Sequence, residues 1–331
     1  MNKDIENREM INKKTIFDLK YIGKFYLTAE YFDIVKFKEK YFLYFTQYNV
    51  LKVIISDDYD FMNKKVNESI TCPLSTFSFI VEENYIYMLC GGQITAKSPN
   101  EIKIPTYHIL GTKYTTVLPH HVKRNDRRNG VYLLRSKNGI NWEPLYDKPV
   151  MHLFVDSNTC KLGECGYDTR PVLIKHNNEY IYYGRLNIGP SERYIYYRKS
   201  RNLINWNAPH KINITNEFKT TIDGNLYKNN YYNLAIFKYN GLIYAFVPYF
   251  ESYKDYLRRY VNCKTILMKS ENGVDWEIIN SYLPIKEKYD IRACCVIIKK
   301  DNINVFFREY IKKPKQKLVS YEFKYPCQKD L

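Results

Sequence analysis

One short repeat, in which a serine ends a strand and a tryptophan follows six residues later, constrains the fold most strongly. It occurs as Ser136-Lys-Asn-Gly-Ile-Asn-Trp142, Ser200-Arg-Asn-Leu-Ile-Asn-Trp206 and Ser270-Glu-Asn-Gly-Val-Asp-Trp276. Serine and asparagine side chains bond their own backbone in turns, and glycine adopts positive φ without steric cost. Because all three tryptophans of the protein lie in this context, we expect each to fold back over its strands as a hydrophobic plug.

A meander of three short strands precedes each of these closing turns. The clearest copy is Gly166 to Trp206, where β-branched and aromatic runs alternate with polar turns containing Asn, Gly or Ser, a pattern typical of antiparallel strands. In the copy that starts at Phe77 the third strand is delayed to Val131–Ser136, so residues 91–130 are expected to form a long insertion. Five copies begin at or near Asp33, Phe77, Asp168, Asn233 and Asp290.

Such a meander cannot bury its own faces, so repeated copies must stack on one another. Five copies predict an all-β fold, a five-bladed β-propeller, because radial stacking leaves only short and protected sheet edges. A strand near Tyr21 to Thr28 is expected to complete the last blade. Residues 1–14 have no usable period and are expected to be a mobile tail, and residues 15–331 a single domain.

The composition agrees with a large folded domain. The chain has 331 residues, 45% of them hydrophobic, and a net charge of +16, which attracts anionic partners such as nucleic acid, acidic glycans and phospholipid headgroups. No run of eighteen apolar residues occurs and the N-terminus lacks the apolar core of a secretory signal. We therefore expect a cytoplasmic protein without a membrane span.

The cysteines favour free thiols over a disulfide framework. There are eight, with no Cys-Xaa-Xaa-Cys pair and no histidine at zinc-ligand spacing. Several lie in apolar runs, as Cys294 and Cys295 do, which is typical of buried thiols in a reducing compartment. Neither a metal nor a cofactor is expected.

Candidate site residues follow from the propeller. The first strand of each blade lines the central channel, and alternation puts residues two apart on the same face. The third and fifth copies each offer a Tyr-Asp-Xaa-Arg pair, and an arginine ends the second strand of each. Buried ion pairs that hold the blades together, a ligand site and a catalytic site all remain open for these residues. The channel-facing set comprises Asp33, Ser75 or Thr76, Asp168 with Arg170, Asn233, and Asp290 with Arg292, followed by Arg185 and Arg308 at the second strands.

At these residues the chain resembles the five-bladed glycoside hydrolases of the arabinanase, xylosidase and invertase type, and their bacterial glycosyl-hydrolase-like relatives. The resemblance covers roughly residues 20 to 325 and rests on the serine-to-tryptophan turns, on Phe154-Val-Asp-Ser-Asn-Thr159 and on the Ala-Pro209 that follows Trp206. Sialidase turns are one residue longer, so the six-bladed sialidases are less similar.

The resemblance implies a channel with three carboxylates. Asp33 matches the position of the catalytic base, and Glu164, in Gly-Glu-Cys-Gly, is similar to the invertase-type Glu-Cys. The second-blade position, Pro73-Leu-Ser-Thr-Phe77, has no carboxylate, although a general acid and base need a carboxylate pair. Asp168 and Asp290 complete the catalytic candidates, while Arg170, Arg185, Arg292, Arg308 and Asn233 are the candidates for ligand binding.

Two functional hypotheses remain. The chain acts on or binds a carbohydrate, or another anionic ligand, in the channel; alternatively it is a non-catalytic propeller that binds a protein, an acidic glycan or nucleic acid. The basic stretch 119–130, Pro-His-His-Val-Lys-Arg-Asn-Asp-Arg-Arg-Asn-Gly, could contact phosphates. No nucleic-acid-binding fold accompanies that stretch, so a solvated loop is the favoured interpretation.

Overall fold

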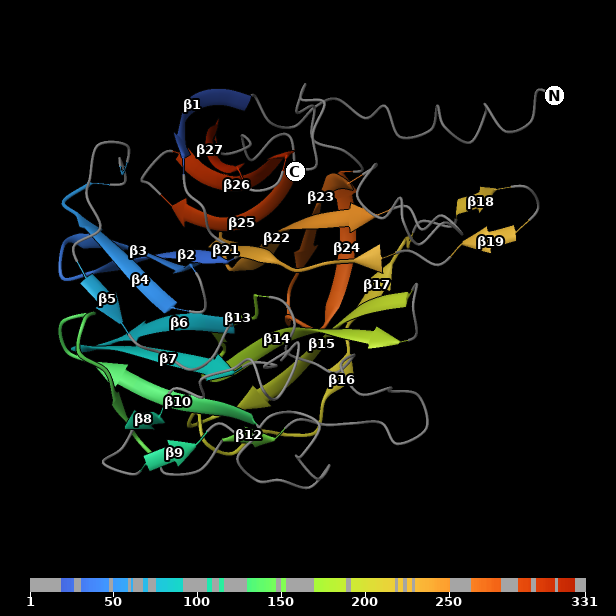
Figure 1. The fold of residues 1–331 in the computed structure, drawn as a ribbon. Coiled ribbons are helices and arrows are strands. Elements are labelled where there is room, and N and C mark those ends of the chain that lie inside the picture. The colour runs from blue at the N-terminus through green and yellow to red at the C-terminus, as the bar shows by residue number, and fades with distance from the viewer. Residues whose placement is uncertain are drawn as a thin grey trace, which may run out of the picture. The chain divides into compact units, whose positions relative to one another are not determined.

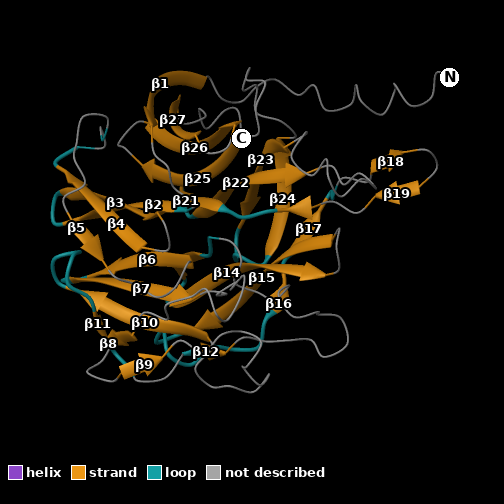
Figure 2. Ribbon diagram, in the orientation of Figure 1, coloured by secondary structure: helices purple, strands orange, loops and turns teal. Residues whose placement is uncertain are grey.

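In the computed structural model, the residues that can be described form β-strands joined by turns and loops (Figure 2). Within the described part of the chain there is no helix of the length and hydropathy that crossing a bilayer requires. The described residues are 19–26, 31–47, 50–58, 61, 68–70, 76–91, 106–108, 113–115, 130–146, 150–152, 170–188, 192–217, 220–222, 225–227, 230–250, 263–280, 291–298, 302–312 and 315–324.

Five sheets of four or more strands follow one another along the chain, and they are the blades (Figure 1). Blade one contains β2 (Phe32–Phe37), β3 (Lys40–Gln47), β4 (Val50–Ser56) and β5 (Glu68–Ile70). Blade two contains β6 (Thr76–Glu82), β7 (Tyr85–Gly91), β10 (Gly130–Ser136), β11 (Glu143–Pro144) and β12 (Met151–His152). Blade three contains β13 (Val172–His176), β14 (Glu179–Ile188), β15 (Glu192–Ser200) and β16 (His210–Lys211).

Blade four contains β21 (Ala235–Tyr239), β22 (Leu242–Phe250), β23 (Cys263–Ser270) and β24 (Asp275–Asn280), extended by β17 (Asn213–Thr215) and β20 (Asn230–Tyr231). Blade five contains β25 (Ile291–Ile298), β26 (Asn302–Lys312), β27 (Lys315–Lys324) and the N-terminal β1 (Leu19–Tyr26). Two small hairpins pair β8 (Thr106–His108) with β9 (Lys113–Thr115), and β18 (Thr220–Ile222) with β19 (Asn225–Tyr227).

The chain packs as two compact units. Blades one to three lie in Ala29–Lys211, and blades four and five in the unit that joins Met1–Thr28 to Ile212–Leu331. Inside the first unit β6 contacts both β2 and β13, and inside the second β21 contacts β25. First strands of successive blades therefore lie side by side within each unit, as they do in a propeller. The predicted all-β propeller is confirmed.

The N-terminal strand completes blade five, as predicted. β1 pairs antiparallel with β27, with Leu19 opposite Phe323 and Tyr26 opposite Lys317. The expected tail, residues 1–14, lies outside the described residues, as does most of the 91–130 insertion beyond the β8–β9 hairpin. The single-domain interpretation stays a prediction.

The three closing turns have a common hydrogen-bond pattern. In blade two, Ser136 Oγ accepts a bond from the Gly139 N–H at 2.9 Å, and Asn138 Oδ1 accepts bonds from the N–H groups of Ile140 and Asn141. Asn202 in blade three and Asn272 in blade four each accept the equivalent pair. Serine and asparagine thus satisfy the backbone donors of a turn that leaves the sheet.

The tryptophans of these turns are buried to different extents. Trp276 is 1% exposed and donates its indole N–H to the Gly273 carbonyl at 3.2 Å. Trp142 and Trp206 are half-buried and meet Tyr44 and Tyr182 edge-on, with ring centroids 6.0 and 6.1 Å apart. Edge-on contacts of this kind are favourable for aromatic pairs.

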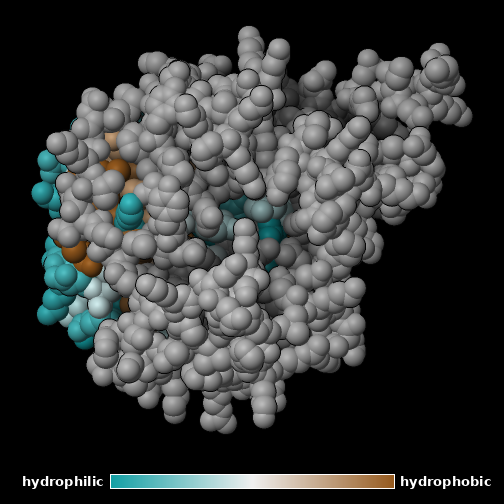
Figure 3. Space-filling view, in the orientation of Figure 1, coloured by the Kyte–Doolittle hydropathy of each residue, from teal (hydrophilic) through white to brown (hydrophobic). Residues whose placement is uncertain are grey.

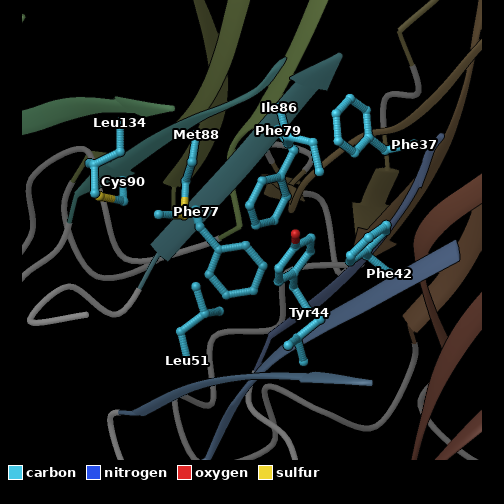
Figure 4. Close-up of a cluster of buried hydrophobic side chains, with 11 residues drawn as sticks. Phe37, Phe42, Tyr44, Leu51, Phe77, Phe79, Ile86, Met88, Cys90 and Leu134 are labelled. Carbon is cyan, nitrogen blue, oxygen red and sulfur yellow. The ribbon is translucent and has the colours of Figure 1, made fainter. Parts of the chain in front are cut away.

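A core of aromatic side chains fills the space between blades one and two (Figure 4). Tyr44 lies at its centre, stacked on Phe79 with ring centroids 4.2 Å apart. The hydroxyl of Tyr44 donates to the Gly139 carbonyl at 2.7 Å, and burial raises the pKa of Tyr44. The closing turn of blade two is thereby fastened to the second strand of blade one.

The hairpin turns are polar on the surface. Hydrophilic side chains gather at the left edge of Figure 3, where the turns of blades one and two lie in Figure 1. These turns include the exposed residues Lys38 and Glu39 between β2 and β3. Their positive φ angles, 47° and 61°, match the right-handed twist of a tight hairpin.

Candidate ligand-binding site

A buried ion pair joins the inner strands of blades one and three. Asp33 lies near the start of β2, and Arg170 lies two residues before β13. Arg170 Nη2 is 2.6 Å from Asp33 Oδ1, and the same oxygen accepts a bond from the Ile34 N–H at 2.9 Å. Asp33 is 8% exposed and Arg170 is 7% exposed. Charges this deeply buried are stable only when paired and hydrogen-bonded.

The order of the first strands explains how these two residues meet. β6 contacts both β2 and β13, so the pair reaches across the first strand of blade two. Thr76, at the start of β6, is buried and donates its hydroxyl to the Gly91 carbonyl of its own blade. Ser78, two residues on, is 1% exposed, and its hydroxyl has no hydrogen-bond partner among the described residues. Blade two therefore supplies hydroxyls where the resemblance implied a carboxylate.

A second arginine lies beside the first on blade three. Arg185 on β14 is 4% exposed. β13 and β14 pair with Val172 opposite Tyr183, and the same register continued by two residues sets Arg185 opposite Arg170. Directly opposite residues of an antiparallel pair have Cβ atoms about 4.5–5.5 Å apart. Two guanidinium groups and one carboxylate therefore belong to this part of the fold.

Tyr183 shares the face of β14 with Arg185, because the two are two residues apart on one strand. It is 2% exposed, and its burial, with the neighbouring Tyr197 as a smaller cause, raises its pKa well above 10.0. Its hydroxyl stays neutral across the ordinary pH range and serves as a hydrogen-bonding group rather than a charge. The face thus combines cationic and neutral polar groups.

The other predicted site residues are distributed as follows. Glu164, Asp168 and Asp290 lie outside the described residues. Arg292 and Arg308 are directly opposite each other in the β25–β26 pairing of blade five, repeating the register of Arg170 and Arg185. Asn233 precedes β21 and is half-buried. Their roles stay predictions, as does a nucleic-acid contact at 119–130, which also lies outside the described residues apart from Gly130.

The sequence alone did not reveal the partner of Arg170. The Tyr-Asp-Xaa-Arg pattern pointed to Asp168, which lies outside the described residues and stays a prediction, and it gave no sign of the ion pair that Arg170 forms with Asp33 of blade one. Asp33 and Arg170 are far apart in the chain, and only the assembly of three blades brings them together. Arg198, which is 8% exposed on β15, was also missed, because nothing in a tyrosine-rich strand marks an arginine as buried.

Among the described residues there is no group of three His, Cys, Asp or Glu side chains that could hold a metal ion. Cys90 and Cys295 are buried, and neither forms a disulfide. The described part of the site therefore offers hydrogen bonds and charge. It holds one carboxylate, paired with an arginine, whereas acid–base hydrolysis of a glycoside needs two.

Comparisons with known proteins find solved structures that have a similar fold. No family model matches the chain, and no protein matches in a search of curated sequences. Among solved structures it is similar to a thermostable family-43 glycoside hydrolase, with 12% sequence identity, a TM-score of 0.57, and 92% of this chain and 91% of that chain covered. An endo-arabinase from Bacteroides thetaiotaomicron VPI-5482 matches at 13% identity and a TM-score of 0.56, with 89% and 94% covered.

The RS223 β-xylosidase matches at 11% identity and a TM-score of 0.55, with 93% of this chain and 95% of that chain covered. At this identity the likeness shows the fold. The chain has the all-β propeller fold of the glycoside hydrolase structures of the arabinanase and xylosidase type, and the resemblance found in the sequence is confirmed at that level.

Proposed function

We propose that this protein binds a carbohydrate at the inner strands of blades one to three, with Asp33 and Arg170 as central contacts. The observation that carries the proposal is their buried ion pair, located at the starts of the innermost strands, where propellers bind their ligands. The structural neighbours that carry glycoside hydrolase, arabinase and xylosidase names support a saccharide. Saccharide hydroxyls both donate and accept, so they suit a site with a carboxylate, a guanidinium and a serine hydroxyl.

A second candidate function is glycoside hydrolysis with Asp33 as the base. It is favoured by the position of Asp33, a carboxylate on the first strand of blade one. Two observations make binding the better supported function. Asp33 Oδ1 already accepts bonds from Arg170 and from the Ile34 N–H, and the described part of blade two supplies Thr76 and Ser78 in place of a carboxylate.

Binding is tested by titrating the protein with a panel of neutral and acidic oligosaccharides and measuring heats of binding. Asp33→Asn keeps the shape of the side chain but breaks the ion pair, so we expect it to weaken saccharide binding by about tenfold or more. Glu143→Gln is the matched control, because Glu143 is an exposed carboxylate whose partner is Arg135 at 2.6 Å. Equal affinities for the parent and Asp33→Asn would contradict the proposal.

Hydrolysis is tested on the same proteins with aryl glycosides. A positioned base contributes on the order of a hundredfold or more to the rate, so Asp33→Asn should abolish any turnover shown by the parent. Turnover that survives in Asp33→Asn would refute Asp33 as the base. Saccharide binding without turnover in the parent would establish the binding function alone.

A further inference from the structure

The tryptophans of the three closing turns differ in what their indole N–H groups bond. Trp206 donates to the carbonyl of Leu203 at 2.8 Å, and Trp276 donates to the carbonyl of Gly273 at 3.2 Å. In both turns the acceptor lies three residues before the tryptophan. The indole nitrogen of Trp142, in blade two, is buried and has no hydrogen-bond partner among the described residues. One of the three turns therefore lacks a bond that the other two form.

The acceptor that corresponds to Trp142 already has another donor. That acceptor is the carbonyl of Gly139, three residues before Trp142, and it accepts the hydroxyl of Tyr44 at 2.7 Å. Tyr44 belongs to β3 of blade one, so a group from a different blade takes the place of the indole. Buried donors rarely stay unpaired, because an unmade bond costs more than a formed bond contributes. Competition for one carbonyl accounts for the unpaired indole.

The backbone of the turn is alike in all three blades. The residue that carries the acceptor carbonyl has a φ of 76° at Gly139, 63° at Leu203 and 75° at Gly273. The asparagine at the third position of the motif accepts two backbone bonds in each turn. The Gly139 carbonyl is therefore presented to Trp142 in the same way as the other two carbonyls are presented to their tryptophans.

We infer that the Gly139 carbonyl is a shared acceptor, bonded by Tyr44 of blade one in one state of the molecule and by Trp142 of its own blade in another. The structure described here is the first of these states. When the hydroxyl leaves, the indole satisfies the carbonyl, so the closing turn keeps its hydrogen bonds. The bond between Tyr44 and Gly139 is then a releasable link between blades one and two.

This link lies beside the proposed site. Tyr44 is directly opposite Asp33 in the β2–β3 pairing, and directly opposite residues share one face of a sheet. The ring of Tyr44 is stacked on Phe79 of blade two (Figure 4). The bond to Gly139 thus holds the strand pair that carries Asp33 against blade two, and its release loosens that pair without opening the closing turn. The inference stands whatever the protein binds.

Nuclear magnetic resonance of the protein with ¹⁵N-labelled tryptophan tests the exchange of donors, because each of the three tryptophans gives one indole N–H signal. Tyr44→Phe keeps the aromatic ring and its effect on neighbouring signals but removes the competing hydroxyl. We expect the Trp142 indole proton to move downfield, as a proton does when it forms a hydrogen bond. Its exchange with deuterium should slow by about tenfold or more.

Tyr182→Phe is the matched control. Tyr182 meets Trp206 edge-on with ring centroids 6.1 Å apart, against 6.0 Å for Tyr44 and Trp142, and the Trp206 indole is already bonded. Its signal should therefore stay in place. An equal downfield shift in this control would show that losing a nearby hydroxyl moves the signal without a new bond, and would overturn the inference.

A double-mutant cycle measures the same exchange through stability. Trp142→Phe removes the substitute donor and keeps an aromatic ring. Since the indole replaces the lost bond in the parent, Tyr44→Phe should lower the folding equilibrium constant about tenfold more in the Trp142→Phe background than in the parent. Two side chains that only pack against each other would give the opposite sign, because a contact already lost cannot be lost again. Urea unfolding of the four proteins gives the comparison.

The contrary results are well defined. An unmoved Trp142 signal in a folded Tyr44→Phe protein would mean that the indole does not take the carbonyl, or that the carbonyl accepts both donors at once, and either overturns the inference. Additive losses in the cycle would also overturn it. A Tyr44→Phe protein that fails to fold, as judged by thermal melting, would do the same, because the indole would then be no substitute for the hydroxyl.

Discussion

At the scale of single residues, two glycines share one backbone conformation in different surroundings. Gly139 has a φ of 76° and Gly241 a φ of 79°, a region that residues with a Cβ rarely adopt. A Cβ at Gly139 would lie 2.5 Å from the Phe42 ring and 2.9 Å from the Tyr44 hydroxyl, whereas one at Gly241 would meet nothing within 4 Å. Gly139 is needed for packing as well as for its conformation.

Replacing each glycine by alanine separates the two effects. Gly241→Ala should cost about 1–2 kcal/mol of unfolding free energy, the strain of the left-handed conformation alone. Gly139→Ala adds a clash with the core and should cost about 1–3 kcal/mol more. Denaturant unfolding measures both. Equal losses would show that the closing turn does not pack against blade one as tightly as described.

The closing turn of blade three has leucine at the position where the closing turns of blades two and four have glycine. Leu203 takes a φ of 63°, and its side chain is buried in the core between blades two and three. Its burial offsets the strain of the left-handed backbone. Leu203→Gly should therefore destabilise the protein, by about 2 kcal/mol in urea unfolding, because the lost packing exceeds the relieved strain. A stabilised variant would mean that strain dominates at this turn.

At the scale of elements, the closing turns of blades three and four bury their tryptophans to different extents. In blade four Trp276 is fully buried and bonded to the Gly273 carbonyl, whereas Trp206 in blade three is half-buried and bonded to the Leu203 carbonyl at 2.8 Å. The tryptophan of the same motif is thus part of the hydrophobic core in blade four and only partly buried in blade three.

Truncating these side chains should reveal that difference. Trp276→Ala should cost about 3–5 kcal/mol, as expected for a large aromatic residue in a core, and Trp206→Ala distinctly less. Thermal unfolding monitored by circular dichroism provides the comparison. If Trp206→Ala proved the more destabilising variant, exposure would be a poor guide to the role of the turn.

The strands and closing turns were predictable because their signals are local. Alternating residues, as in Tyr85–Gly91, and a serine at the strand end set each meander without reference to the rest of the chain. The fourth strands of blades two and three were not predictable from pattern, because β11 and β16 have two residues each. Asp33 and Arg170 could be named as candidates from the sequence, and both are buried, but their pairing depends on the order of three blades and has no local signature. Their role in binding stays a prediction.

At the scale of the whole molecule, buried tyrosines couple stability to alkaline pH. Burial raises the pKa of both Tyr44 and Tyr183 well above 10.0. Below pH 10 the folded and unfolded states both keep these protons. Above it the unfolded state loses them first, so the unfolding free energy falls as pH rises until the native pKa is reached.

Each such tyrosine contributes a slope of about 1.4 kcal/mol per pH unit above pH 10. Tyr44→Phe and Tyr183→Phe should each reduce the slope of stability between pH 10 and 11, measured by urea unfolding. Tyr146→Phe is the control, since Tyr146 is 41% exposed. An unchanged slope in both buried variants would mean that other groups govern the alkaline transition.

The pairing of β1 with β27 has a consequence for synthesis on the ribosome. Leu19 of β1 is synthesised about 300 residues before its partner Phe323, so β1 has no β27 to pair with while blades one to four are being made. An unpaired strand is a template for pairing between chains, and contacts this distant in sequence form slowly. Blade five is therefore completed only after β27 has been made, and until then β1 is a strand that chaperones have reason to protect.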